Sequence, residues 1–135
     1  MDKPVPEGLK NTFLVHAFVC LVLGLPFLLA PDLFASVLGF ATIEPVSARG
    51  LGAALLALGV SSWLALIEPI WQRVAIVLKM EIAYTIVGGL ALLYEVVAAG
   101  APPSTWFFFI VIAIFAALWL LYYFSEAPAE AKKWI

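Results

Sequence analysis

Residues 49–67 form an uninterrupted apolar stretch, RGLGAALLALGVSSWLALI, that decides the fold. As an α-helix this stretch would be about 29 Å long, close to the hydrocarbon thickness of a bilayer. Small residues spaced by four allow a second helix to approach closely in lipid, where packing holds helices together. Such a row is formed by Ala53, Ala57, Ser61 and Ala65. The pattern predicts a membrane-spanning helix at the centre of a helix bundle.

The composition of the whole chain supports lipid as the solvent. The 135 residues are 65% hydrophobic and only 12% charged, whereas soluble domains are about 45–50% apolar and about 25% charged. The formal net charge of −2 gives no electrostatic basis for nucleic acid as a partner. We expect a single membrane domain with lipids as its surroundings.

Four apolar segments predict four transmembrane helices in one domain covering residues 1–135. Their expected limits are about 12–30, 48–67, 72–98 and 104–124. The segment between the first two spans is too short to cross and predicts a short interfacial helix. The tight connection Glu68-Pro69-Ile70 makes the second and third spans antiparallel neighbours. Gly88 and Gly89 of the third span are then expected to face the small residues of the second. The predicted fold class is an all-α, four-helix membrane bundle.

The distribution of basic residues predicts the orientation. Only Arg49 lies on the side of the membrane opposite the two termini, and the termini side carries Lys3, Lys10, Arg73, Lys132 and Lys133. Because cytoplasmic loops carry the excess of lysine and arginine, we expect both termini in the cytoplasm. The predicted location is a cell inner membrane, crossed several times.

Three ionisable residues inside the spans, His16, Lys79 and Glu81, need an explanation because such groups are costly in lipid. Lys79 is expected to reach the headgroups with its long side chain. Glu81 is predicted to face the bundle, with His16, Tyr84 or Tyr122 as its partner. Two interpretations stay open. Glu81 is either a hydrogen-bonded pin that fixes the helix register, or a group that binds a proton, a cation or a polar ligand headgroup.

A second charged pair is predicted at the opposite side of the membrane. Arg49 and Glu95 lie at the ends of the second and third spans, so we expect them to pair, with Asp32 or Glu44 adding to the cluster. The alternative is that both are solvated interface charges.

Recognisable catalytic and metal-binding patterns are missing from the sequence. It contains no nucleophile elbow, no glycine-rich phosphate loop and no zinc-ligand spacing. One histidine excludes an intrachain bis-histidine haem, and one cysteine, Cys20, excludes an internal disulfide. Neither a metal nor a cofactor is predicted, and a quinone or a lipid is the ligand class that the polar residues of the spans would suit.

Residues 20–65 resemble the DoxX-like group of small four-span membrane proteins. The resemblance rests on a proline-ended first span, a short amphipathic segment and an arginine-glycine opening of the second span. These features are Gly24-Leu25-Pro26 with residues 30–34 (APDLF), Leu38-Gly39-Phe40, and residues 49–59 (RGLGAALLALG). It implies a four-helix bundle and, for some members, service as a small subunit of a quinone-linked redox complex. It carries over no catalytic residue.

Three hypotheses for function follow. The first is a non-catalytic accessory or scaffold subunit that packs against other membrane protein subunits or against itself. The second is a protein that binds, or acts enzymatically on, a small hydrophobic ligand such as a quinone or a lipid. The third is a dimeric proton-coupled small transporter in which Glu81 is the coupling group. The first is favoured, and with it the absence of enzymatic activity.

Overall fold

The computed structural model describes residues 3–126, which form an all-α fold with four long helices and one short one. All four long helices are long and apolar enough to cross a membrane, which confirms the predicted membrane four-helix bundle. The basic residues Lys132 and Lys133 lie outside the described residues. The helices are α1 (Glu7–Leu29), α2 (Pro31–Val37), α3 (Pro45–Ile67), α4 (Trp71–Val97) and α5 (Thr105–Glu126).

Helices α1 and α3 begin several residues before the apolar runs that marked them in the sequence. Pro6 precedes the first turn of α1. The Glu44 side chain caps α3 by accepting hydrogen bonds from the backbone N–H groups of Val46 and Ser47, at 3.0 and 2.6 Å. Capping satisfies backbone donors that a helix start leaves free, so polar residues next to an apolar run extend the helix beyond it.

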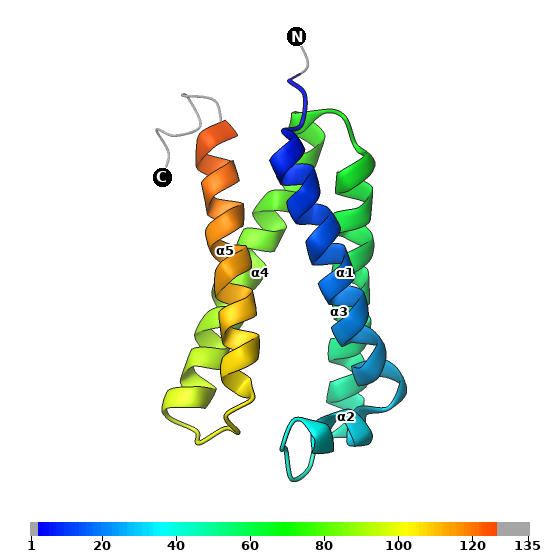
Figure 1. The fold of residues 1–135 in the computed structure, drawn as a ribbon, viewed down its shortest axis with the longest axis vertical. Helices are drawn as coiled ribbons and strands as arrows, with labels where there is room; N and C mark the ends of the chain where they lie inside the picture. The colour runs from blue at the N-terminus through cyan, green and yellow to red at the C-terminus, as the bar shows by residue number, and fades with distance from the viewer. Residues whose placement is uncertain (1–2, 127–135) are drawn as a thin grey trace.

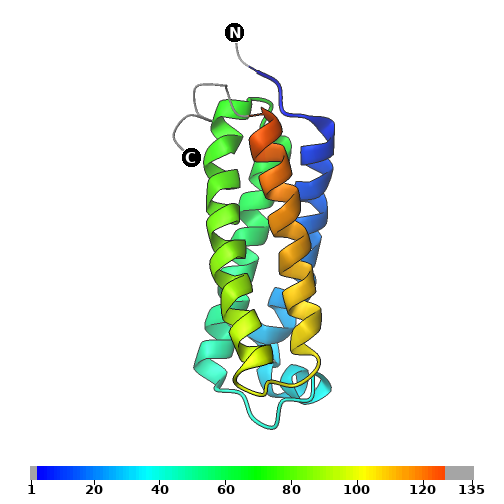
Figure 2. The ribbon, with the colours of Figure 1, turned by 90° about the vertical axis from the view of Figure 1, so that its left-hand side faces the viewer.

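The four long helices form two pairs. Helix α1 packs along α3, and α4 packs along α5. Figure 1 shows the pairs closest at the end of the molecule where the chain begins, and farther apart at the opposite end, where α2 lies. Figure 2 shows the same bundle from the side of α4 and α5. We call these the termini end and the far end.

This pairing differs from the expectation that the second and third spans are neighbours along their length. The turn after Ile67 does bring the start of α4 next to the end of α3, but α4 then inclines away from α3 toward the far end (Figure 1). A tight turn fixes where two helices start together, and the side chains between them decide how far they stay together.

The face of α3 that packs therefore differs from the predicted row of small residues. Ala53 and Ala57 are exposed, Ser61 is half-buried, and only Ala65 is buried. At about 100° per residue, the face packed against α1 is on roughly the opposite side of the helix from that row. It contains Ala48, Gly52, Gly59 and Ser62.

Gly52 is the point of closest approach between α1 and α3. A Cβ atom at this position would lie 2.6 Å from the backbone nitrogen of Leu28 and 2.8 Å from the carbonyl oxygen of Gly24. Gly88 and Gly89 of α4, expected to face α3, instead face α5. A Cβ at these positions would meet the Ile112 side chain at 3.6 and 3.4 Å.

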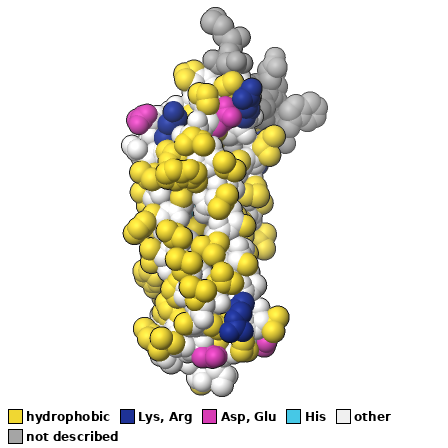
Figure 3. Space-filling model, turned by 90° about the vertical axis from the view of Figure 1, so that its right-hand side faces the viewer, with side chains coloured by type: hydrophobic (Ala, Val, Ile, Leu, Met, Phe, Trp, Pro, Cys, Tyr) yellow, Lys and Arg dark blue, Asp and Glu magenta, His cyan; other side chains and the backbone are white. Residues whose placement is uncertain are grey.

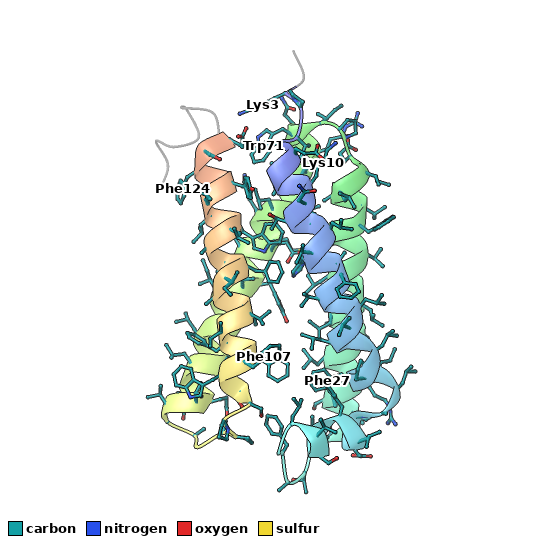
Figure 4. All side chains as sticks on the ribbon, viewed as in Figure 1. Lys3, Lys10, Phe27, Trp71, Phe107 and Phe124 are labelled. Atoms are coloured by element: carbon teal, nitrogen blue, oxygen red, sulfur yellow. The ribbon has the colours of Figure 1, made fainter. Side chains whose placement is uncertain are left out.

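The termini end is tightly packed. Trp119, Phe13, Leu9 and Leu78 have essentially no exposed surface. The residues before α1 pair with the turn before α4, because the Val5 N–H donates to the Pro69 carbonyl and the Trp71 N–H donates to the Lys3 carbonyl. Figure 4 shows Lys3 and Trp71 together at this end.

The outer surface matches a lipid environment. Figure 3 shows one face on which hydrophobic side chains form a broad band and charged side chains collect near its two ends. Large exposed apolar side chains occur on every long helix, among them Phe18, Trp63, Val87 and Leu121. Such a surface is stable in lipid and would aggregate in water.

Candidate functional site

The inward-facing residues of the long helices follow an alternating spacing of three and four. On α4 they are Trp71, Val74, Leu78, Glu81, Thr85, Gly88 and Leu92. This spacing is typical of nearly parallel or antiparallel helices packed side by side. At the termini end the positions carry large side chains that fill the bundle. Beyond Glu81 on α4 they carry the smaller Thr85 and Gly88, followed by Leu92.

A cavity of about 370 Å³ lies in the part of the bundle toward the far end, between the two helix pairs. All four long helices and the loop after α2 contribute to its wall, and most of the wall is aliphatic or aromatic. None of the wall residues within the described part of the chain is a lysine, arginine, aspartate or glutamate. The wall includes Leu23, Phe27, Ile43, Leu55, Ala91, Phe108 and Ile112.

A buried polar cluster closes this cavity toward the termini end. The cluster consists of His16 of α1, Ser62 of α3 and Glu81 of α4, and Glu81 is 0% exposed. The Nδ1 atom of His16 is 2.8 Å from Ser62 Oγ and 3.8 Å from Glu81 Oε1. The Ser62 hydroxyl is 3.4 Å from Glu81 Oε1. One serine hydroxyl thus connects the only histidine of the chain to its most deeply buried carboxyl group.

The ring of His16 is held by its surroundings. It makes edge contacts with Phe115, at a centroid distance of 4.6 Å, and with Trp119, at 5.4 Å. Its other nitrogen, Nε2, is 3.5 Å from Cys20 Sγ, a weak hydrogen-bonding partner. Both His16 and Cys20 belong to the cavity wall, whereas Glu81 lies behind them and is not part of it.

The Glu81 carboxyl group is only partly satisfied. Its Oε1 atom accepts hydrogen bonds from the hydroxyl groups of Ser62, at 3.4 Å, and Ser61, at 3.5 Å. The Ser61 hydroxyl has a closer acceptor in the Leu58 carbonyl, at 2.8 Å. Within residues 3–126, Oε2 has no hydrogen-bond partner. Buried polar atoms without partners are rare in proteins. The unused acceptor of Glu81 is therefore unusual for a cluster that serves packing alone.

The structure separates the three partners proposed for Glu81. His16 lies beside it, as described. Tyr84 is half-buried in the cavity wall, and no hydrogen bond of its hydroxyl group is found among the described residues. Tyr122 is near the C-terminal end of α5, and its hydroxyl group lies over Gly8 of α1.

The predicted cluster of Arg49 and Glu95 is not formed. Both side chains are exposed, and the ion pairs of residues 3–126 do not include either. The physical reason is the divergence of α3 from α4 toward the far end, so the structure matches the alternative of two solvated charges. Glu44 caps α3. The hydrogen bonds that its carboxylate accepts from backbone N–H groups hold its pKa below the usual value.

No role in a site was predicted for two polar residues of the far end. Thr105, at the start of α5, is 3% exposed and lines the cavity, and its hydroxyl group has no partner within the described residues. The Ser104 hydroxyl donates a hydrogen bond to the Leu38 carbonyl, which links the start of α5 to the end of α2. The alternating spacing of α5, which contains Thr105, Phe108, Phe115 and Trp119, was the available signal for Thr105.

The comparisons with known proteins give no relatives: no protein-family model, no curated protein and no solved structure matches this chain. In residues 3–126, no three histidine, cysteine, aspartate or glutamate side chains are grouped so that they could hold a metal ion. The chemistry of the site therefore has to be argued from the cavity and from the polar cluster beside it.

Proposed function

We propose that this membrane protein binds a small hydrophobic molecule, of the lipid or quinone class, in the cavity between its two helix pairs. The observation that carries the proposal is the cavity itself. Its volume of about 370 Å³ falls in the range of about 300–1,000 Å³ that is typical of ligand sites.

The composition of the wall supports a hydrophobic ligand. Ligand sites are mostly apolar, with a few polar groups that orient the bound molecule. Here the apolar wall ends at His16, with Tyr84 also on the wall, and Thr105 marks another polar point at the start of α5. From Thr105 to Phe115, which contacts His16, the helix rises about 15 Å. A cavity of that length suits a chain-like or flat apolar molecule.

The orientation in the membrane stays a proposal. Lys3, Lys10 and Arg73 all lie at or near the termini end, and Arg49 lies near the start of α3 at the far end. The positive-inside rule then favours an inner membrane with the termini end in the cytoplasm, and the cavity would lie in the outer half of the bilayer.

The other two hypotheses stay predictions. A docking face for partner subunits has no residue-level signal, because lipid-facing and partner-facing apolar surfaces look alike in a membrane protein. A proton-coupled transporter needs Glu81 to meet its substrate, whereas Glu81 lies behind the wall of the cavity.

Probes with a dodecyl chain test the proposal. We would reconstitute the protein in phosphatidylcholine nanodiscs and measure saturable binding of radiolabelled dodecanol by scintillation proximity, with nanodiscs lacking protein as the blank. Ala91→Phe places a ring on the cavity wall and should abolish binding. The control Ala83→Phe makes the same change on the same helix, at an exposed position outside the wall, and should leave binding unchanged. Absence of saturable binding of any dodecyl probe to the unmodified protein would refute the proposal.

A further inference from the structure

We infer that the ligand is electrically neutral and carries an oxygen atom that hydrogen-bonds to Nε2 of His16. This inference rests on the proposed binding function and specifies the chemical class of the ligand. It is drawn from three observations. In the described part of the chain, the wall of the cavity contains no charged side chain, the Nε2 atom of His16 has only a weak protein partner, and Ser62 connects His16 to Glu81.

A wall without charges disfavours ionised fatty acids and phospholipid headgroups as ligands. A charged group buried away from water is very costly unless an opposite charge pairs with it. Among the described residues, the wall contains no lysine or arginine that could pair with a carboxylate or a phosphate.

The same geometry disfavours a cationic ligand. Glu81 is 0% exposed, and His16, Cys20 and Thr85 form the neighbouring wall. An ammonium group in the cavity would meet a wall of neutral groups. It would find no carboxylate within hydrogen-bonding distance in the wall.

His16 belongs to the cavity wall, and one of its two ring nitrogens has only a weak protein partner. Nδ1 is occupied by Ser62 at 2.8 Å, while the only protein partner of Nε2 among residues 3–126 is the Cys20 sulfur at 3.5 Å. A ligand oxygen would offer Nε2 a much stronger hydrogen bond than a thiol does. The edge contacts of the ring with Phe115 and Trp119 keep it in place for that bond.

The link through Ser62 lets Nε2 act either as a donor or as an acceptor. When the Ser62 hydroxyl donates to Glu81, Nδ1 donates to Ser62 and Nε2 of the neutral ring is an acceptor. When Ser62 instead donates to Nδ1, the proton of the neutral ring is on Nε2, which is then a donor. The first state suits a ligand hydroxyl and the second a ligand carbonyl, so the cluster accommodates both kinds of neutral oxygen.

A set of four probes with one chain and different headgroups tests the inference. Dodecanol, dodecanoate, dodecyltrimethylammonium and dodecane are compared in the nanodisc assay at pH 7.5. Dodecanol should bind at least roughly tenfold more tightly than either ion, and roughly fivefold to tenfold more tightly than dodecane, which corresponds to one hydrogen bond. Dodecanoate or the ammonium probe binding as tightly as dodecanol would overturn the inference, and so would dodecane doing so.

Substitutions locate the hydrogen bond. His16→Phe keeps an aromatic ring and should remove the preference for dodecanol over dodecane while leaving dodecane binding intact. Val15→Phe, which places the same side chain on the same helix at an exposed position outside the wall, is the matched control and should retain the preference. If His16→Phe does not fold, Ser62→Ala serves instead, because without the serine the tautomer of His16 is no longer held and the preference should fall. A folded variant at either position with an unchanged preference would overturn the assignment to His16.

These outcomes separate the two proposals. Saturable binding of all four probes with equal affinity would support the hydrophobic site and refute the neutral-oxygen assignment. Lack of binding by all four would refute both.

Discussion

The termini end and the far end of the bundle continue the same four helices, yet one is solid and the other contains a cavity. On α4 the inward positions change from Trp71, Val74 and Leu78 to Thr85, Gly88 and Leu92. On α5, Trp119 lies in the solid half, while Phe108 borders the cavity. The helix pairs diverge toward the far end, which widens the space, and the residues there become smaller. The comparison teaches that the cavity is encoded in the sequence, because filling a widening bundle would need larger residues.

The largest expected difference between the halves concerns their aromatic residues. Trp119→Ala should lower the free energy of unfolding by about 3 kcal/mol, because it leaves a hole among fully packed neighbours. Phe108→Ala should cost clearly less, since its ring already borders a cavity. Denaturation in mixed micelles, followed by circular dichroism, measures both. Equal losses would mean that the two halves are packed alike.

A second experiment addresses the close contact that holds α1 against α3. Gly52→Ala should destabilise the protein by about 2 kcal/mol, because the new methyl group meets backbone atoms of α1 that cannot move aside. The matched control is Gly50→Ala, where a Cβ atom meets nothing within 4 Å. This control should be neutral or slightly stabilising. The same denaturation assay applies, and a neutral Gly52→Ala would contradict the observed approach of the two backbones.

The polar cluster at the boundary between the halves should contribute less. Ser62→Ala removes the hydroxyl between His16 and Glu81 and should cost about 1.5 kcal/mol, because two buried groups lose a partner. Ser36→Ala is the control, since Ser36 is exposed and donates only to the Leu33 carbonyl of its own helix. A loss no greater than that of the control would show that the cluster is not held together through Ser62.

The smallest effect is expected outside the membrane, at Glu44. Its pKa is lowered in the folded protein by hydrogen bonds from the start of α3. A lowered folded-state pKa stabilises the protein above the ordinary glutamate value of about 4.3, and this contribution is lost as the pH falls through the folded-state pKa.

Glu44→Gln should therefore flatten part of the fall in unfolding temperature between about pH 5 and pH 3. Glu95→Gln is the control, since no ion pair of its carboxylate occurs in the described residues. The expectation fails if the two variants show the same pH dependence.

The number and order of the helices could be predicted from the sequence because lipid allows few alternatives. A spanning segment must satisfy its backbone hydrogen bonds internally, so each long apolar run becomes a helix. The short α2 also followed from the length of the segment between the first two spans. The location of Glu81 inside the bundle followed from the cost of leaving an ionisable group in lipid, but the choice of His16 over Tyr84 and Tyr122 as its neighbour did not.

The packing faces could not be predicted in the same way. Spans that are apolar all round do not mark their inner side by hydrophobicity, and α3 offers two rows of small residues. The row of Ala53 and Ala57 was predicted to pack, whereas α1 packs on the row of Ala48 and Gly52. The predicted pair of Arg49 and Glu95 was wrong for a related reason. Its prediction required α3 and α4 to stay together over their full length.

The pairing of α1 with α3 and of α4 with α5 has a consequence for biogenesis. Each pair is continuous in the chain, and along the chain the two pairs are connected by the short turn at residues 68–70. Each pair can thus assemble in the bilayer as soon as it has been synthesised, and a single late association completes the protein. We expect two separately expressed fragments, divided at that turn, to find each other in the membrane.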